Sequence, residues 1–487
     1  MPLIAAGETT SKFSRCVGTL VATLAAFSIG TYLSWSSSAL PHYRRSDTLR
    51  SVGDQEASWI TSLLPLGAIP SVLPAVMLAD KFGRKRTIWA AGVLLFTCWY
   101  IVAFARTETW LFLARFAAGS ACGAASVVVP MFISEIAERR STWDSLGVFR
   151  SQITAGILFA YATAFADGAC VIAILCSAAP ALLLISLPFV PESPVWLQDR
   201  RTCDTLSHFG GSSRAETGST KRVAETRAGI SELWDHRHRR PICIVLGLIF
   251  FQQLSGVNAL IFHASEIFDT TGVSSPDPVL SSVIVGVVQL IATCFSTVII
   301  ERANKKLLLF VSASTMATSM FTLSGYFHFQ NSRELSSVFW IPLLSCAVFI
   351  ATFSLGFGPL PWMMLGELFA ENARRAAVPV VAMWSWTLAF LATKCFRNMV
   401  DLMGTSSSFA TFGMISLIGA AFVSALVPER RTKSAEEVQI ELCRACDRNR
   451  RELAIGTRPK PDEATETPET TDVAVIERTS TLDLCLT

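Results

Sequence analysis

Long stretches without a single charged side chain recur along the chain, and they constrain its fold more than any other feature. Crossing the hydrocarbon core of a membrane takes about 20 apolar residues in a helix. Charged residues make up only 16% of the sequence, against about 25% in a typical soluble protein. The stretches that lack Asp, Glu, Lys and Arg are 16–41, 57–79, 87–105, 151–166, 168–191, 241–262, 278–300, 307–327, 335–366, 376–393 and 402–428, and 109–134 is interrupted only by Arg115.

These stretches predict an all-α membrane protein with twelve transmembrane helices. The short stretch 151–166 needs a helix that starts near Leu146 and takes Arg150 into the membrane edge. Alternate loops, above all 80–86 and 192–240, hold most of the Lys and Arg residues outside the helices. Because basic loops stay in the cytoplasm, we expect both termini to be cytoplasmic, with the plasma membrane as the default location. The net charge of +3 gives no reason to expect nucleic-acid binding.

Features of the first six predicted helices recur in the last six. The loop Asp-Lys-Phe-Gly-Arg-Lys-Arg at 80–86 is matched by Glu-Arg-Ala-Asn-Lys-Lys at 301–306, and each follows the second helix of its group. Repeats of six helices with a substrate held between them are typical of secondary transporters. The expected organisation is a cytoplasmic N-terminus (1–15), an N-terminal six-helix half (16–191), a cytoplasmic linker (192–240), a C-terminal six-helix half (241–428) and a mostly disordered cytoplasmic tail (429–487).

The repeated loops predict a gate at the cytoplasmic end of the bundle. Gly83 suits a tight return between helices that needs a positive φ. The carboxylate of Asp80 opposes the helix dipole and so needs a cationic partner. Pairs of this kind across the two halves would hold the cytoplasmic side shut, whereas a plain basic loop is the alternative. The expected gate residues are Asp80, Gly83, Arg84, Glu135, Glu192, Glu301, Arg302, Lys305, Glu367, Arg374 and Glu429.

A set of motifs in a fixed order resembles one known family. They include Arg115-Phe, Pro130-Met-Phe-Ile-Ser-Glu-Ile, Pro191-Glu-Ser-Pro, Gln252-Gln-Leu-Ser-Gly-Val-Asn and Gly358-Pro-Leu-Pro-Trp, together with the two loops above. Over roughly residues 10–440 the chain is similar to the sugar-porter branch of the major facilitator superfamily, and most similar to its arthropod trehalose-transporter-like subgroup. The resemblance implies a carrier of small-molecule sugars that is not an enzyme and needs no cofactor, metal or obligate protein partner.

The chemistry of a sugar site is also readable from the residues themselves. A sugar presents many hydroxyls and no charge, so its site needs side-chain amides, which donate and accept at once. Gln252, Gln253 and Asn258 supply them, although Gln253 and Asn258 lie about 140° apart on an ideal helix. A helix broken near 255–256 would remove that separation. Hydrogen bonding between helices is the alternative role for these amides.

The resemblance adds further candidates to the site. It implies that Gln289 binds the sugar and that Trp362 faces the sugar ring, whereas anchoring at the membrane interface is the alternative for any membrane Trp. Pro359 and Pro361 predict a discontinuous helix 10. His263 and Glu266, near the outer end of helix 7, are expected to have ordinary surface roles.

Three departures from the family pattern bear on function. Arg150 stands where many relatives have a sugar-binding Gln, which predicts an altered substrate site unless the side chain snorkels to the cytoplasmic edge. Thr142-Trp143 and Val195 replace arginines of the gate, which predicts a weaker gate in the first half. Helix 1 has no acidic residue between Cys16 and Pro41, and a membrane carboxylate is the simplest proton carrier.

These features together favour facilitative transport of trehalose or a hexose by alternating access. A proton-coupled symporter remains the first alternative, because an acid elsewhere could carry the proton. A sugar sensor that does not transport is the second, motivated by Arg150 and the missing arginines.

Overall fold

A computed structural model describes most of the apolar part of the chain. The described residues are 12–45, 53–136, 142–166, 168–198, 200, 239–270, 277–330, 338, 340–369 and 371–428. All of them belong to one compact unit, Met1–Gln439, and they contain helices but no strand. Most of the predicted N-terminal segment 1–15, most of the linker 192–240 and the tail 429–487 lie outside the described residues, so their expected structure stays a prediction.

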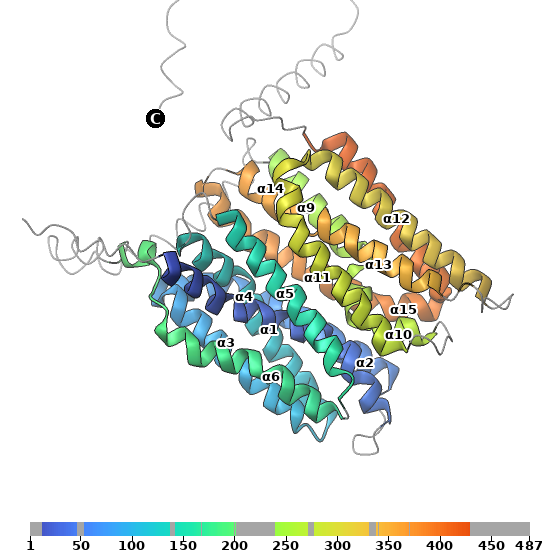
Figure 1. The fold of residues 1–487 in the computed structure, drawn as a ribbon, viewed down its shortest axis with the longest axis horizontal. Helices are drawn as coiled ribbons and strands as arrows, with labels where there is room; N and C mark the ends of the chain where they lie inside the picture. The colour runs from blue at the N-terminus through green and yellow to red at the C-terminus, as the bar shows by residue number, and fades with distance from the viewer. Residues whose placement is uncertain are drawn as a thin grey trace, which may run out of the picture. The chain divides into compact units, whose positions relative to one another are not determined.

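The first half of the bundle, drawn from blue to green in Figure 1, consists of six long helices and one short turn of 3-10 helix. They are α1 (Lys12–Arg45), α2 (Asp54–Phe82), α3 (Arg84–Ala103), α4 (Glu108–Ile136), α5 (Thr142–Thr163), α6 (Ala169–Ser186) and η1 (Leu187–Phe189).

The second half, drawn from yellow-green to red, contains the interrupted helices. They are α9 (Arg239–Leu254), α10 (Val257–Thr270), α11 (Pro278–Arg302), α12 (Lys305–Gln330), α13 (Trp340–Leu355), α14 (Leu360–Leu368) and α15 (Glu371–Leu426). In Figure 1 α14 lies at one end of the bundle and α10 reaches the other. We call these the α14 end and the α10 end.

The helices account for twelve membrane spans among the described residues. Ten helical segments are long and apolar enough to cross a membrane. The 22-residue α5 adds an eleventh, and the 56-residue α15 is divided by non-helical backbone at Gly404 into two. The prediction of an all-α twelve-helix membrane protein is therefore confirmed. Residues 394–401 separate the last two charge-free stretches, so the sequence predicts a loop there. This prediction is wrong, because residues 394–401 are helical and the turn lies at Gly404.

Two spans are interrupted where the sequence predicts it. α9 ends and α10 begins on either side of Gly256, which has a φ of 98°, a conformation that only glycine adopts without strain. α13 and α14 are separated by residues 356–359. Phe357 cannot continue the helical hydrogen-bond pattern through its carbonyl group, because the residue four positions on is Pro361, which has no N–H. Both breaks lie deep inside the bundle.

Close contacts between glycines and backbone hold the first half together. A methyl group added at Gly30 would lie 2.0 Å from the carbonyl oxygen of Ile153, and one at Gly156 would lie 2.1 Å from that of Phe27. Small residues at such crossings allow two membrane helices to approach closely. α1 and α5 therefore pack backbone to backbone.

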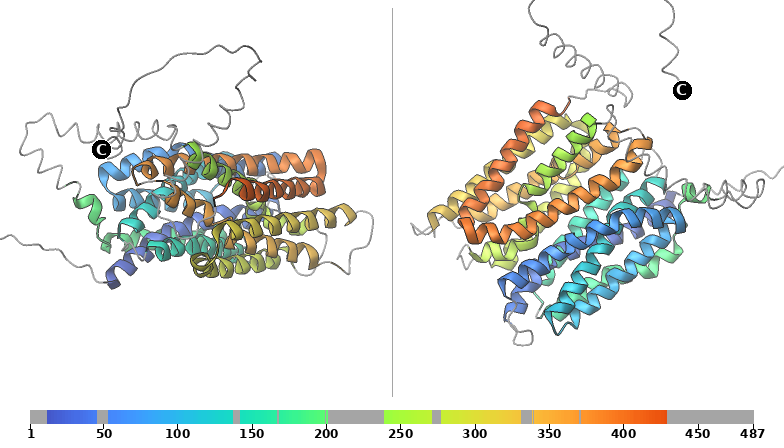
Figure 2. Two further views of the ribbon diagram at one scale, coloured as in Figure 1. Left: turned by 90° about the horizontal axis from the view of Figure 1, so that it is seen from above. Right: turned by 180° about the vertical axis from the view of Figure 1, so that it is seen from behind.

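The two halves meet along two helix pairs. α2 packs against α15, as the right-hand view of Figure 2 shows, and α5 packs against α11. α1 also contacts α10. These contacts leave the broken spans α9–α10 and α13–α14 next to the border between the halves.

Candidate functional site

The amides predicted to bind a sugar meet where the two spans are interrupted. Gln252 exposes only 3% of its surface. Its Nε2 donates to the carbonyl oxygens of Phe357, at 2.6 Å, and of Gly358, at 2.9 Å. Asn258 donates from Nδ2 to Oε1 of Gln253 at 2.8 Å. The structure thus brings all three predicted amides together.

The break at Gly256 explains why residues on opposite faces of an ideal helix become neighbours. Because the chain changes direction between α9 and α10, Asn258 reaches both the side chain and, at 3.0 Å, the backbone oxygen of Gln253. The break in the other span contributes as well. The Phe357 carbonyl, which has no helical donor, is satisfied by the Gln252 amide.

The cluster keeps acceptor and donor capacity for a ligand. Gln253 donates from Nε2 to Oγ of Ser385 at 2.8 Å, whereas Oδ1 of Asn258 accepts no hydrogen bond from any described residue. Gln289 on α11 is buried, with 4% exposure, and its side-chain amide is likewise unbonded within the described part of the chain. Such amides match hydroxyl groups, which also donate and accept.

Trp362, the candidate that faces the sugar ring, and Trp386 differ in their surroundings. Trp362 on α14 exposes 36% of its surface, and no described aromatic ring or cation contacts it. Trp386 on α15 donates from Nε1 to Oγ of Ser126 on α4 at 3.3 Å and packs against the core of the first half. Trp386 therefore joins the two halves, while the ring of Trp362 remains accessible.

Arg150 crosses from the first half to the second. It lies about two turns inside α5, yet a methyl group added at Gly358 would lie 2.7 Å from its Nη2. The guanidinium therefore rests on the same turn that Gln252 binds. The nine residues of α14 separate this turn from the α14 end by about 14 Å of helix. Snorkelling to the membrane edge is therefore wrong, because the side chain turns toward the helix break.

A compact ionic network occupies the α14 end of the first half. Arg84, 4% exposed, binds Asp80 at 2.9 Å and both carboxylate oxygens of Glu135 at 3.0–3.1 Å. Gly83, with a φ of 108°, turns the chain so that Glu192 accepts from the backbone N–H of Lys85 at 2.9 Å. A side chain at Gly83 would collide with Glu192, since its Cβ would lie 2.5 Å from Oε2.

The acids of this first-half network have partners although two arginines of the family pattern are missing, and whether the gate is weaker stays a prediction. Arg84 fills part of that role, and the hydroxyl of Ser193 donates to Glu135. All of these residues belong to the first half or to the linker residues that directly follow it. Within the described residues, the network therefore does not join the two halves.

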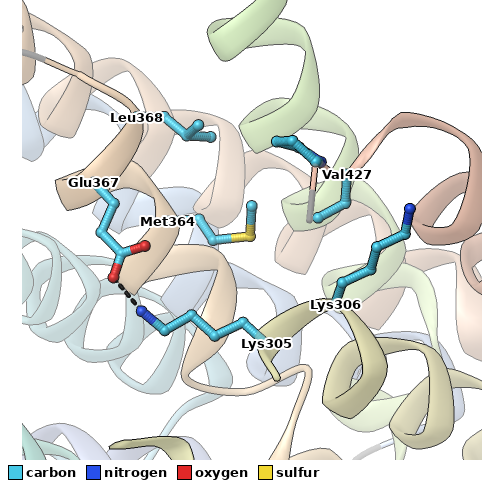
Figure 3. A pocket seen from close by; sticks show the side chains of 7 residues that line it. Lys305, Lys306, Met364, Glu367, Leu368 and Val427 are labelled. Atoms are coloured by element: carbon cyan, nitrogen blue, oxygen red, sulfur yellow. Dashed lines mark hydrogen bonds and ion pairs between the residues drawn. The ribbon is translucent and has the colours of Figure 1, made fainter. Parts of the chain in front are cut away.

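The second half has a smaller counterpart. Lys305 pairs with Glu367 beside a shallow pocket that Met364, Leu368 and Val427 also line, as Figure 3 shows. Asn304 begins α12 by accepting from the backbone N–H of Lys306 at 3.1 Å. The pocket lies at the α14 end, away from the amide cluster.

The remaining predicted gate residues are not brought together. Glu301, Arg302 and Arg374 are exposed, and none of them forms an ion pair with another described residue. Glu429 lies outside the described residues. Their role in a gate stays a prediction.

A second ionic cluster, which the sequence did not reveal, closes the α10 end. Arg397 on α15 pairs with Glu266 on α10, with Asp54 on α2 at 2.8 Å and with Asp401 at 3.5 Å. His263 lies 3.0 Å from Glu266 through Nδ1. Treating 394–401 as a loop hid this cluster. The spacing of Lys394 and Arg397, which share one helical face, is the signal that would have revealed it.

Neutral hydrogen bonds reinforce this closure. Ser36 on α1 donates to the carbonyl oxygen of Phe262 on α10 at 3.1 Å, and the hydroxyls of Ser37 and Ser265 lie 3.0 Å apart. Lys394 lies 3.9 Å from the ring centroid of Trp59 on α2. These contacts join the two halves at the α10 end.

Arg115 on α4 is fully buried without an acidic partner among the described residues. Its Nε donates to the carbonyl oxygen of Ile60 at 3.0 Å and its Nη1 to that of Tyr32 at 2.9 Å. The guanidinium also lies 5.2 Å from the ring centroid of Trp35. Backbone carbonyls and an aromatic ring thus stabilise this cation.

Comparison with known proteins places these features in one family. The family described as "Sugar (and other) transporter" matches residues 16–442. A "Facilitated trehalose transporter Tret1" of Culex quinquefasciatus is 32% identical over 448 residues, 88% of this chain and 86% of the relative. A protein of the same name from Aedes aegypti is 33% identical over 88% of this chain, which spans only 55% of that longer relative.

A solved structure supports the fold independently. The partially occluded inward-open conformation of the xylose transporter XylE from E. coli superimposes with a TM-score of 0.70, at 22% identity, over 87% of this chain and all of that one. The identity is low, so the likeness concerns the fold. With the family match over most of its length, the chain belongs to the sugar transporter family, and it is a transporter rather than an enzyme.

Proposed function

We propose that this protein carries a sugar, trehalose or a hexose, across a membrane by facilitated diffusion. The buried amide cluster at two helix breaks is the observation that carries the proposal. It offers neutral donors and acceptors in the interior of a membrane bundle, which is where a transporter binds its substrate. The names of the similar insect proteins agree with trehalose as a substrate.

This geometry supports binding roles for the amides, and the family resemblance supports one for Trp362. Gln252, Gln253, Asn258 and Gln289 bind sugar hydroxyls, and Trp362 lies against the sugar ring. Flat aromatic faces suit the apolar face of a sugar ring, and each amide can exchange bonds with the protein for bonds with hydroxyls. Arg150 borders the same site.

Transport without proton coupling is favoured by the surroundings of Arg115. A proton carrier in the membrane is usually a carboxylate close to a basic residue. Arg115 instead binds backbone carbonyls of α1 and α2, and α1 carries no acidic residue.

Alternating access is supported by the contacts that close the α10 end of the bundle and by the charged residues gathered at the α14 end. At the α10 end, ion pairs and hydrogen bonds cross between the halves. At the α14 end, Arg84 pairs with Asp80 and Glu135, and Lys305 pairs with Glu367. We assign the α14 end to the cytoplasm, because its loops are basic. The charged residues at this end would form a gate, which closes when the two halves come together there. We further propose that the protein resides in the plasma membrane and needs no obligate protein partner.

Uptake of radiolabelled trehalose and glucose into oocytes tests the proposal. Saturable uptake that is equal at two external pH values is expected. Faster uptake in acidic medium would indicate a proton-coupled symporter instead. A protein that reaches the cell surface and binds sugar but gives no uptake would be a sensor, the alternative for which the unusual Arg150 speaks.

A further inference from the structure

We propose that the site accepts sugars that carry an anionic group, a carboxylate or a phosphate, and that Arg150 binds this group. The inference rests on the proposed function in one respect, namely that the amide cluster binds a sugar. It goes further by naming the class of sugar and the residue that selects it.

Arg150 is the cation of the site, and it has no ion-pair partner among the described residues. Its side chain forms no hydrogen bond or ion pair with any described residue. The described carboxylates that form ion pairs lie at the two ends of the bundle, such as Glu135 and Glu367 at one and Asp54 and Glu266 at the other. A charged side chain deep in a membrane protein is costly without a partner, so an ionisable residue there points to a ligand or a relay.

Arg115 shows how this protein surrounds another buried cation with backbone acceptors, although its Nη2 has no hydrogen-bond partner among the described residues. Two backbone carbonyls accept hydrogen bonds from Arg115, and the Trp35 ring lies beside it. Arg150 is half-buried, with no comparable acceptors in the described structure. It thus keeps its donors available.

The position of Arg150 fits a substituent of a bound sugar. Its Nη2 lies against Gly358, and Gln252 donates to the carbonyl oxygen of that same residue. A sugar bound by the amides would therefore lie within reach of the guanidinium. The planar fork of an arginine matches carboxylate and phosphate groups with two parallel hydrogen bonds. A hydroxyl can accept one bond, but it leaves the positive charge uncompensated.

Binding measurements on the purified full-length protein in detergent test this inference. The probes are glucose, glucuronate and glucose 6-phosphate, with acetate and inorganic phosphate as anions that lack the sugar. We expect glucuronate or glucose 6-phosphate to bind at least tenfold more tightly than glucose. The preferred probe tells whether carboxylate or phosphate is recognised. Arg150→Gln should remove this preference, whereas Arg106→Gln, which removes an exposed arginine, should leave it intact.

The outcomes separate the inference from the proposed function. Glucose binding that equals or exceeds the binding of both anionic sugars would overturn the inference alone. An anion preference that survives in Arg150→Gln would also overturn it. If none of the sugars binds, the proposed function fails as well. If Arg150→Gln does not fold, the unaltered protein still tests the inference, because its relative affinities for glucose and the two anionic sugars can be measured.

Discussion

At the scale of single residues, Gln252 combines two roles that the sequence presents as alternatives, namely bonding between helices and binding of a sugar. Gln252 bonds one helix to another, because its Nε2 satisfies the carbonyls of Phe357 and Gly358. Its side-chain oxygen accepts only a long bond, 3.4 Å, from Gln253. The amide group can therefore hold the helix break and still accept from a ligand. Helix–helix bonding and sugar binding are therefore compatible roles for Gln252.

The residue types of the site were predictable, but their neighbours were not. Amides in an apolar stretch are chemically conspicuous, so Gln252, Gln253 and Asn258 stand out. Where Arg150 points depends on which span packs beside α5, and this is a long-range contact that periodicity does not encode. For the same reason the partners of Glu135 could not be chosen from among nearby arginines.

Replacing Gln252 by Ala tests this double role. The change leaves the Phe357 carbonyl without a donor, which should lower the free energy of unfolding by about 1–3 kcal/mol. It should also raise the KM for sugar uptake roughly tenfold, the equivalent of about 1.4 kcal/mol of binding. Thermal unfolding in detergent and uptake kinetics measure the two effects. Gln55→Ala, at an exposed position, is the matched control, and equal behaviour of the two variants would contradict the assignment.

At the scale of helices, charge-free stretches and prolines carried most of the information. They located twelve spans and the break before α14, because membrane thickness and the missing proline N–H act locally. The predicted loop 394–401 failed for a physical reason. Lys394 and Arg397 end a charge-free stretch, yet both remain helical because α2 and α10 supply partners for them. Contacts with other helices thus outweigh the local tendency of charged residues to mark the end of a membrane helix.

The contact of α1 with α5 makes a prediction at this scale. In Gly156→Ala the new methyl group would meet the Phe27 carbonyl at 2.1 Å, so the two backbones must separate. Overpacking of this kind costs about 1–3 kcal/mol, and we expect a lower unfolding temperature and weaker expression. Gly325→Ala is the control, since nothing lies within 4 Å of the added methyl group. If both variants unfold at the same temperature, the close approach of α1 and α5 is wrong.

For the whole molecule, the ionic cluster that closes the α10 end is the feature that sequence reasoning missed. The repeated loops drew attention to the α14 end. The cluster around Arg397 gathers side chains from α2, α10 and α15, which are far apart in the chain. No repeat or motif marks it, and only the packing of the halves reveals it.

Loss of this cluster should loosen the α10 end. Arg397→Gln removes the ion pairs with Glu266 and Asp54, so states in which this end is open should become more populated. Hydrogen exchange followed by mass spectrometry should then be faster in α10 than in the unaltered protein. Arg106→Gln, which removes an exposed arginine without an ion pair among the described residues, should not change the exchange. Unaltered exchange in Arg397→Gln would show that the cluster does not hold the end closed.

The central claim is that the two halves alternate around one sugar site, and counterflow in proteoliposomes tests it most directly. The purified protein is placed in vesicles loaded with unlabelled sugar, and a trace of the same sugar, labelled, is added outside at equal pH on both sides. We predict a transient accumulation of label above its equilibrium level, which Gln252→Ala diminishes, because a carrier that opens alternately exchanges one sugar for another. Label that never exceeds the level in protein-free vesicles would contradict the account.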